Sequence, residues 1–303
     1  MASIPGSQRE AKGFGTARRP CDARSVTAAT TETEWIERAR AGDRNALDEL
    51  IALHQSRIYG FGMKMCRDPE DAKDILQETL LAMARGIHDF RGASSLSTWL
   101  YTVARSHCIK KRRRGKFEPT RVSSLETEDQ EAAAYVRDES DLPDEALASK
   151  RLDAAIEDAI AALDPMYREV LVLRDVEGLT APEVGDILGV SVQAVKSRLH
   201  RARLFVRERV APLFVEPELP AAPGGTCPDV LSLFSAHLEG EISADTCAAM
   251  ERHLDGCARC RGACDSLKRT LALCRTRENA VVVPPDVQAS VRLAVRDFLA
   301  EKR

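Results

Sequence analysis

Four residues near the C-terminal end of the chain have types and spacing suited to holding a metal ion. Cys227 is followed, after a gap, by His253, Cys257 and Cys260 in the pattern His-x3-Cys-x2-Cys. His253 and Cys257 are about one helical turn apart, so both side chains can point at one ion, and Cys260 can close the site from the turn behind. One imidazole and three thiolates suit tetrahedral Zn²⁺, and the sequence therefore predicts a zinc site here.

The same part of the chain holds further sulfur and imidazole groups. Six of the nine cysteines lie between residues 227 and 274, a clustering that favours metal or redox chemistry over a structural disulfide framework in a reducing compartment. Cys247, Cys264 and Cys274 are surplus, and His237 could compete as a ligand. We interpret the surplus cysteines as small buried apolar side chains. One alternative stays open: if Cys264 lies beside the site, oxidation could pair it with a ligand thiolate and release zinc.

A second stretch, residues 179–203, has the pattern of a helix-turn-helix that docks on DNA. Thr180 and Ser191 are predicted N-caps, Pro182 suits a first helical turn, and Gly189 is predicted to end the first helix. The second helix combines an apolar face with a polar face, and Arg, Lys and Gln side chains on such a face can contact phosphates or read base edges in a major groove. The predicted DNA-contacting residues are Gln193, Lys196, Ser197, Arg198, His200, Arg201 and Arg203.

Composition predicts an all-α protein of several domains that is not an enzyme. The chain has 303 residues, only 5% aromatic residues and apolar residues that recur at helical spacing. The net charge of -3 conceals segregation, because residues 105–116 carry seven basic and no acidic residues, whereas residues 118–145 carry ten acidic and two basic residues. We find no pair of nucleophile and base, no P-loop and no dinucleotide-binding glycine pattern.

The expected domain order follows from these shifts in composition. We expect a cytoplasmic protein, since no run approaches the roughly 20 apolar residues of a membrane span and the N-terminus lacks a signal peptide. The expected units are a disordered extension (residues 1–33), a helical domain (34–114), an acidic linker (115–148), a second helical domain holding the helix-turn-helix (149–214), a proline-rich hinge (215–226), a small helical zinc-binding domain (227–275) and a tail with an amphipathic helix (276–303).

Three motifs in this order resemble the extracytoplasmic-function (ECF) group of bacterial sigma factors, with region 2, an acidic linker and region 4. They are DAKDILQETL at residues 71–80, FRG at 90–92 with STWLY at 97–101, and DPMYREVLVLRDVEG at 164–178 running into the helix-turn-helix. The segment from Cys227 to Cys274 resembles the zinc-binding anti-sigma fold. The resemblance implies that the chain directs promoter-specific transcription initiation, and that residues 226–303 regulate the sigma part in cis.

Roles for particular residues follow from this resemblance. Core RNA polymerase would be the partner, through its β′ clamp and β flap, and Asp71, Asp74, Gln77 and Glu78 would face the clamp. The helix-turn-helix residues named above would read the -35 element of promoter DNA. The residues implied at the -10 element are Phe90, Arg91, Ser94, Ser95, Arg105, Lys110, Lys111, Arg112, Arg113 and Arg114.

Two other classes of protein stay open at this point. One is a polymerase-independent helix-turn-helix repressor with a metal or redox sensing domain, which would have no use for the docking face at residues 71–81. The other is a zinc-dependent interaction protein whose sigma part serves as a binding decoy. The sequence gives neither the promoter sequences nor the inducing signal.

Overall fold

The computed structural model describes residues 23–117, 144–214, 227–276 and 281–301. Within these ranges it contains helices and no strand, so the expected all-α class is confirmed there. The first part of the expected N-terminal extension, most of the acidic linker and the proline-rich hinge lie outside the described residues. None of the described helices is long and apolar enough to cross a membrane.

The first unit, here called the N-terminal bundle, is built from helices with well-defined starts. Asp43 caps α2 by accepting hydrogen bonds from the backbone of Asn45 and Ala46, and Asp68 caps α3 just before Pro69. Apolar residues fill the interior, where the rings of Phe61 and Tyr101 meet edge to face at 5.4 Å. Its elements are α1 (Ala23–Arg40), α2 (Arg44–Cys66), α3 (Pro69–Gly86), the short η1 (Ile87–Asp89) and α4 (Leu96–Phe117).

Helix α1 begins earlier than the sequence pattern predicted. Residues 23–33, expected to belong to a disordered extension, form the first part of α1. Glu32 lies 3.1 Å from the buried His54 of α2 and ties this part of α1 to the bundle. A weakly apolar, alanine- and threonine-rich stretch carries little periodicity of its own, so this tertiary contact was not visible in the sequence.

The central bundle contains the predicted helix-turn-helix. Thr180 and Glu183 form a capping box at the start of α7, Gly189 ends that helix with a φ of 67°, and Ser191 caps α8. The predicted caps and turn are therefore confirmed. The elements are α5 (Asp144–Ala161), α6 (Pro165–Leu171), the π-helical turn η3 (Val172–Val176), α7 (Ala181–Leu188), α8 (Val192–Val210) and η4 (Ala211–Leu213).

The residues after the hinge form a small C-terminal unit and one separate helix. The unit consists of α9 (Val230–Leu238), α10 (Ala244–Gly256) and α11 (Ala258–Thr276), and it has its own apolar core around Phe234, Leu254 and Leu267. Helix α12 (Pro285–Glu301) follows residues 281–284 and buries Val287, Val291 and Val295. The amphipathic tail helix predicted from the sequence is thus present.

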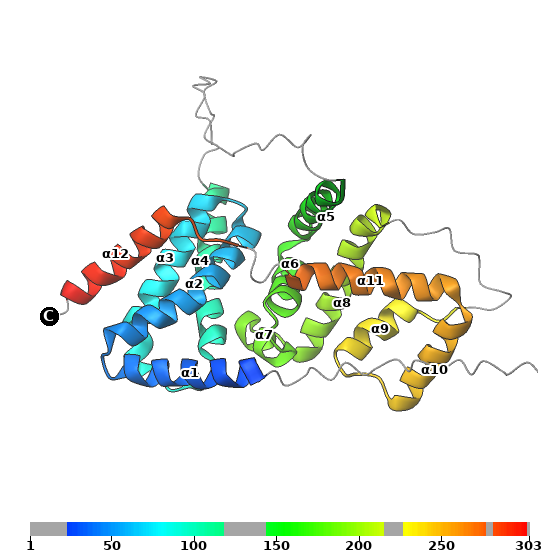
Figure 1. Cartoon of the computed structure of the whole chain (residues 1–303), viewed down its shortest axis with the longest axis horizontal. Coiled ribbons are helices and arrows are strands. Elements are labelled where there is room, and N and C mark those ends of the chain that lie inside the picture. The colour runs from blue at the N-terminus through cyan, green and yellow to red at the C-terminus, as the bar shows by residue number, and fades with distance from the viewer. Residues whose placement is uncertain (1–22, 118–143, 215–226, 277–280, 302–303) are drawn as a thin grey trace, which may run out of the picture.

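The C-terminal residues contact both bundles. Helices α9 and α11 pack against α8 of the central bundle, whereas α12 packs along α3 of the N-terminal bundle (Figure 1). The three valines of α12 belong to the same apolar core as the two bundles. The chain therefore folds back over its own earlier domains, with the central bundle between the N-terminal bundle and the C-terminal unit.

The close contact between α7 and the turn before α8 leads to a prediction about the stability of the chain. A Cβ added at Gly185 would lie 2.9 Å from the backbone oxygen of Val190, which is too close for a rigid backbone neighbour. We expect Gly185→Ala to destabilise the chain by about 1–3 kcal/mol, since the clash outweighs the gain in helix propensity. Thermal unfolding followed by circular dichroism measures this change. The exposed neighbour supplies a control, Asp186→Ala, and equal melting of both variants would contradict the packing described here.

Candidate nucleic-acid interface and metal centre

The polar side of α8 is only partly open to solvent. Gln193, Ser197 and Arg201 are exposed, whereas Lys196, Arg198 and His200 are half-buried. The exposed three lie where a groove-docking helix would present them, although Arg201 also donates a hydrogen bond to the Tyr167 hydroxyl at 3.2 Å. The structure thus brings together six of the seven predicted DNA-contacting side chains on the outer part of α8.

Arg203 departs from the prediction because it is buried inside the molecule. Its side chain is 1% exposed and makes two hydrogen bonds with the Asp175 carboxylate, at 2.7 and 2.8 Å. It also donates to Glu239 at 2.8 Å and to the Ser235 hydroxyl at 3.3 Å. In this arrangement Arg203 cannot reach DNA. Its position explains why, since Arg203 is four residues after Leu199 and three before Val206, both of which are buried.

An acidic turn of the C-terminal unit, residues 239–241 between α9 and α10, holds this side of α8. Glu239 accepts from Arg203 and also from Arg174, the latter at 3.2 Å. Glu241 accepts from Lys196 at 3.0 Å. In the first turn of α9, the Ser232 hydroxyl lies within 3.5 Å of Nε2 of His200. Three of the predicted -35 residues therefore contact the C-terminal unit instead of solvent.

The residues predicted for the -10 element line a loop and one side of α4. Phe90 packs edge to face against Trp99 at 6.3 Å, while Arg91 and Ser94 are exposed. Ser95 is an exposed residue whose hydroxyl lies 3.4 Å from the Glu183 carboxylate. Along α4, Lys110 and Arg113 are exposed, and the side chain of Arg114 lies outside the described residues.

The other described cations predicted to contact the -10 element, Arg105, Lys111 and Arg112, form ion pairs with carboxylates of the same chain. Glu169 of the central bundle accepts hydrogen bonds from Arg105 at 3.0 Å and from Arg112 at 2.9 Å. Lys111 donates to Asp71 and Asp74 of α3 at 2.8 and 2.6 Å, and these hydrogen bonds raise the pKa of the Lys111 ammonium. The structure therefore pairs Lys111, which was predicted to contact the -10 element, with Asp71 and Asp74, which were predicted to face the β′ clamp.

A second contact between the bundles centres on Glu177. Its carboxylate and backbone oxygens accept hydrogen bonds from the Arg57 guanidinium, and the Tyr101 hydroxyl donates to the same carboxylate. Burial raises the pKa of Glu177 above its ordinary value, partly offset by these donors. Sequence reasoning missed Glu169 and Glu177, although Glu169 directly precedes the apolar run at residues 170–173 and Glu177 follows it by four residues, where a buried acid signals a specific partner.

The predicted polymerase-facing residues lie on α3, on its side toward α4. Asp71 and Asp74 form the ion pairs with Lys111, while Gln77 and Glu78 line a shallow hollow with His107 and Lys110. On the same helix, Arg85 lies over the Phe298 ring of α12 at 5.2 Å. The four residues thus share one helix face, as the periodicity predicted.

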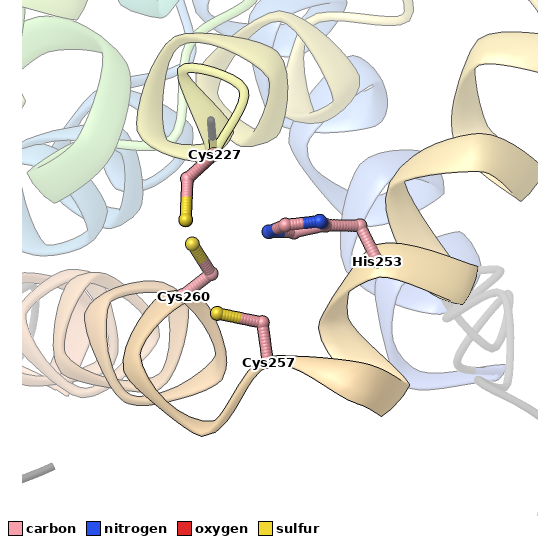
Figure 2. A group of neighbouring side chains, drawn as sticks. All are labelled: Cys227, His253, Cys257 and Cys260. Atoms are coloured by element: carbon pink, nitrogen blue, oxygen red, sulfur yellow. The ribbon is translucent and has the colours of Figure 1, made fainter. Parts of the chain in front are cut away.

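The four predicted metal ligands converge on one point. The candidate ligand atoms of Cys227, His253, Cys257 and Cys260 all lie within 4.8 Å of one another. Cys227 comes from the segment before α9, His253 from α10, Cys257 from the junction, and Cys260 from the first turn of α11 (Figure 2). Nε2 of His253 is buried and has no hydrogen-bond partner in the described part of the chain. A metal ion would satisfy that atom.

The thiols of this cluster influence each other. Hydrogen bonds from the Cys260 backbone and from neighbouring thiols lower the pKa of Cys257, against the effect of burial. Burial and the neighbouring thiols of Cys227 and Cys257 raise the pKa of Cys260 to about 12. Several thiolates at this spacing repel each other unless a cation lies between them, so the donor set fits Zn²⁺.

The surplus cysteines separate into two kinds. Cys264 and Cys274 are buried in apolar cores, as interpreted from the sequence, and burial raises the pKa of Cys264. Cys247 is different, because it is half-buried and contacts His237 and Glu251. The redox hypothesis for Cys264 stays a prediction.

Comparison with known proteins matches three families along the chain. They are sigma-70 region 2 at residues 50–118, sigma-70 region 4 at residues 153–206 and a putative zinc-finger at residues 227–261.

Two curated relatives and one solved structure illustrate the similarity. RNA polymerase sigma-H factor of Pseudomonas aeruginosa is 29% identical over 61% of this chain and 96% of its own length. The ECF RNA polymerase sigma factor SigW of Bacillus subtilis is 30% identical over 59% of this chain and 96% of its own length. The structure of CnrH in complex with the cytosolic domain of CnrY has a TM-score of 0.41 and 22% identity, and the match covers 60% of this chain and 98% of the matched chain.

The N-terminal and central bundles thus coincide with sigma-70 regions 2 and 4, in the order in which the sequence motifs placed them. A relative at 30% identity is matched over almost its whole length, and a zinc-finger-like unit follows region 4. The chain belongs to the extracytoplasmic-function family of RNA polymerase sigma factors.

Proposed function

We propose that this chain binds core RNA polymerase in the cytoplasm and directs initiation at promoters with two recognition elements. The N-terminal bundle would read the -10 element through the loop before α4 and through the cations of α4. The central bundle would read the -35 element through α8. The face of α3 that carries Asp71, Asp74, Gln77 and Glu78 would meet the β′ clamp, and the central bundle would meet the β flap. Family membership and the position of these residues on two helical bundles support this assignment.

The proposal includes regulation in cis by the C-terminal unit. The observation that carries it is the acidic turn, which pairs with Lys196 and Arg203 on the helix that would enter the DNA groove. The phosphates of duplex DNA would also attract Lys196, so turn and promoter compete for that cation, while the pair with the buried Arg203 anchors the turn on α8. Because the turn is part of the same chain, it competes at high effective concentration. The arrangement described here is therefore the inhibited one.

A second set of contacts that would oppose DNA binding lies between the N-terminal bundle and the central bundle. Arg105 and Arg112 are held by Glu169, and Arg57 by Glu177. Contact with nucleic acid through Arg105 and Arg112 would require these pairs to open. The cations are partly exposed, but Glu169 and Glu177 are buried, so opening these pairs would be costly unless polymerase or DNA binding supplied the groups with new partners. Inhibition would thus rest on these buried carboxylates between the bundles together with the buried network around Arg203.

We further propose that Cys227, His253, Cys257 and Cys260 hold a structural Zn²⁺. The ion would supply no reaction chemistry and would fix the segment before α9 to the junction of α10 and α11. The acidic turn follows α9 directly, so the position of Glu239 depends on the anchoring of that helix. Metal binding would in this way keep the turn on α8.

The two alternative classes predict different partners. A polymerase-independent repressor would not co-purify with core polymerase, and a decoy would bind polymerase without starting transcription. Region 2 with its α3 face favours the sigma assignment over a repressor, because a repressor needs only the helix-turn-helix. Absence of both co-purification and transcription, for the full chain and for residues 1–216 alike, would contradict the proposed function.

Neutralising the acidic turn tests regulation in cis. We expect the double variant Glu239→Gln with Glu241→Gln to bind promoter DNA as holoenzyme about tenfold more tightly, which corresponds to about 1.4 kcal/mol. The physical reason is that Lys196 no longer has to leave a carboxylate, and Arg203 keeps only Asp175 as a charged partner. Run-off transcription and salt-matched promoter binding measure the effect. Glu208→Gln, an exposed change on α8, serves as the control, and equal values for all three proteins would contradict the idea.

Removing the metal tests the structural role of zinc. We expect a chelator, or Cys257→Ser, to lower the zinc content, to expose α9–α11 to trypsin and to raise run-off transcription toward the level of residues 1–216. The reason is that three thiolates and one imidazole provide most of the binding energy that holds the small unit together. Elemental analysis and limited proteolysis provide the measurements. Loss of zinc with unchanged proteolysis and unchanged transcription would contradict this role.

A further inference from the structure

Two cysteines of the N-terminal bundle lie next to each other although they are far apart in the sequence. Cys66 is the last residue of α2, and Cys108 lies in the middle of α4, a helix that packs against α2. The Cys108 thiol donates a hydrogen bond to the Cys66 sulfur. Neither residue belongs to the metal centre or to the residues that would contact DNA or polymerase.

The two thiols differ in their access to solvent. Cys108 is 1% exposed and is part of the apolar core, whereas Cys66 packs on the edge of that core and is only half-buried. The backbone turns directly after Cys66, where the exposed Arg67 ends α2 with a φ of 62°. A small reagent can therefore reach Cys66 from solvent, whereas the core shields Cys108.

Positive charge surrounds the Cys66 sulfur. Lys111 and Arg112 lie about one turn after the partner cysteine on α4, and both interact electrostatically with Cys66. Arg168 of α6 does the same from the central bundle, and its guanidinium donates a hydrogen bond at 3.5 Å to the backbone oxygen of the residue before Cys66. The acid in this group is Asp71, whose carboxylate is paired with Lys111 at 2.8 Å. The surroundings of Cys66 therefore favour a negative sulfur.

The contact makes the two sulfurs chemically unequal. The hydrogen bond from Cys108 and the charges of Arg112 and Lys111 lower the pKa of the Cys66 thiol, against the effect of burial. The same hydrogen bond and burial raise the pKa of Cys108. The thiolate is the nucleophile in thiol oxidation, and reactive cysteines are partly exposed and lie in electropositive surroundings. The pair thus consists of one attacking sulfur and one protonated partner.

We infer that Cys66 and Cys108 form a redox-active pair, which a peroxide oxidises to a disulfide. The Cys66 thiolate attacks one peroxide oxygen, the O–O bond breaks, and Cys66 becomes a sulfenic acid while the departing hydroxide takes up the proton that Cys66 has lost. The sulfur of Cys108 then attacks the sulfur of Cys66, the S–O bond breaks, and the second hydroxide takes up the Cys108 proton. Two thiols lose two electrons in total, and hydrogen peroxide is reduced to two molecules of water.

The disulfide would join the last turn of α2 to the middle of α4. The loop that it closes contains the whole of α3, so oxidation holds these three helices of the N-terminal bundle in one arrangement. Exchange with a small dithiol reverses the reaction. The pair lies in a different unit from the metal centre, and its oxidation removes no metal ligand.

Disulfide mapping of the full chain tests the pair. The reduced protein, with its metal centre loaded with Zn²⁺, is treated with a small excess of hydrogen peroxide, the remaining thiols are blocked, and its peptides are analysed by mass spectrometry without reductant. We expect a peptide that joins Cys66 to Cys108 and that dithiothreitol separates. Cys66 should be consumed at least about tenfold faster than the buried Cys264. Arg112→Gln should slow the consumption of Cys66 several-fold, because one neighbouring cation is lost.

Variants of the two cysteines separate the attacking sulfur from its partner. Cys66→Ser should leave Cys108 reduced, whereas Cys108→Ala should stop the reaction at the Cys66 sulfenic acid, which dimedone captures. Circular dichroism checks that each variant is folded. Cys247→Ser removes a half-buried cysteine of the C-terminal unit and is the matched control, which should form the link as wild type does. Cys66 that stays reduced, or that joins another cysteine in place of Cys108, would overturn the pair, and so would equal yields of sulfenic acid in wild type and Cys108→Ala.

Discussion

The buried ion network around Arg203 is the interaction on which the closed arrangement depends. Arg203 and Arg174 face Asp175 and Glu239, so two cations and two carboxylates balance inside a water-poor region. Asp175 belongs to the central bundle, whereas Glu239 belongs to the C-terminal unit. A buried charge needs its partners, and moving Glu239 away would leave Arg203 with one carboxylate and Arg174 without an acidic partner among the described residues. These ion pairs therefore fix the position of the C-terminal unit on the central bundle.

Such a network specifies one arrangement without making it very stable. Desolvation of the four groups offsets much of their attraction, and a hydrophobic contact of equal size would hold the units more firmly. Apolar contacts come from α11, whose buried Cys274 joins the apolar core that the two bundles share, and from α12, whose three valines pack into that core along α3, at a distance from α8 (Figure 1). In the proposed regulation, α12 would keep the C-terminal part of the chain attached while α9–α11 leave α8. Opening can then be local and reversible.

The sequence predicted more of the elements than of their contacts. Caps at Thr180 and Ser191, the turn at Gly189 and the metal ligands His253, Cys257 and Cys260 depend on residues close together in the chain, and the structure agrees with each of them. Arg203 was assigned to DNA by its residue type, although its period with Leu199 and Val206 placed it on the buried face. A buried arginine is chemically reasonable only when its carboxylate partners are known, and Glu239 is distant in sequence.

The same limit applies to the charges between the bundles. The chain's net charge of -3 gave no reason to expect that Arg105 and Arg112 on α4 share Glu169, because such pairing depends on how two separately predicted helical domains pack. In the structure, several cations predicted to contact promoter DNA have a carboxylate of the same chain beside them. DNA competes for them with a dense array of phosphates, and release of its condensed counterions favours the exchange at low salt. Salt weakens the exposed internal pairs as well, but it reaches the buried Arg203 network least. In the proposed regulation, the closed form would therefore gain over the DNA-bound form as ionic strength rises, because solvent ions screen its buried ion pairs least.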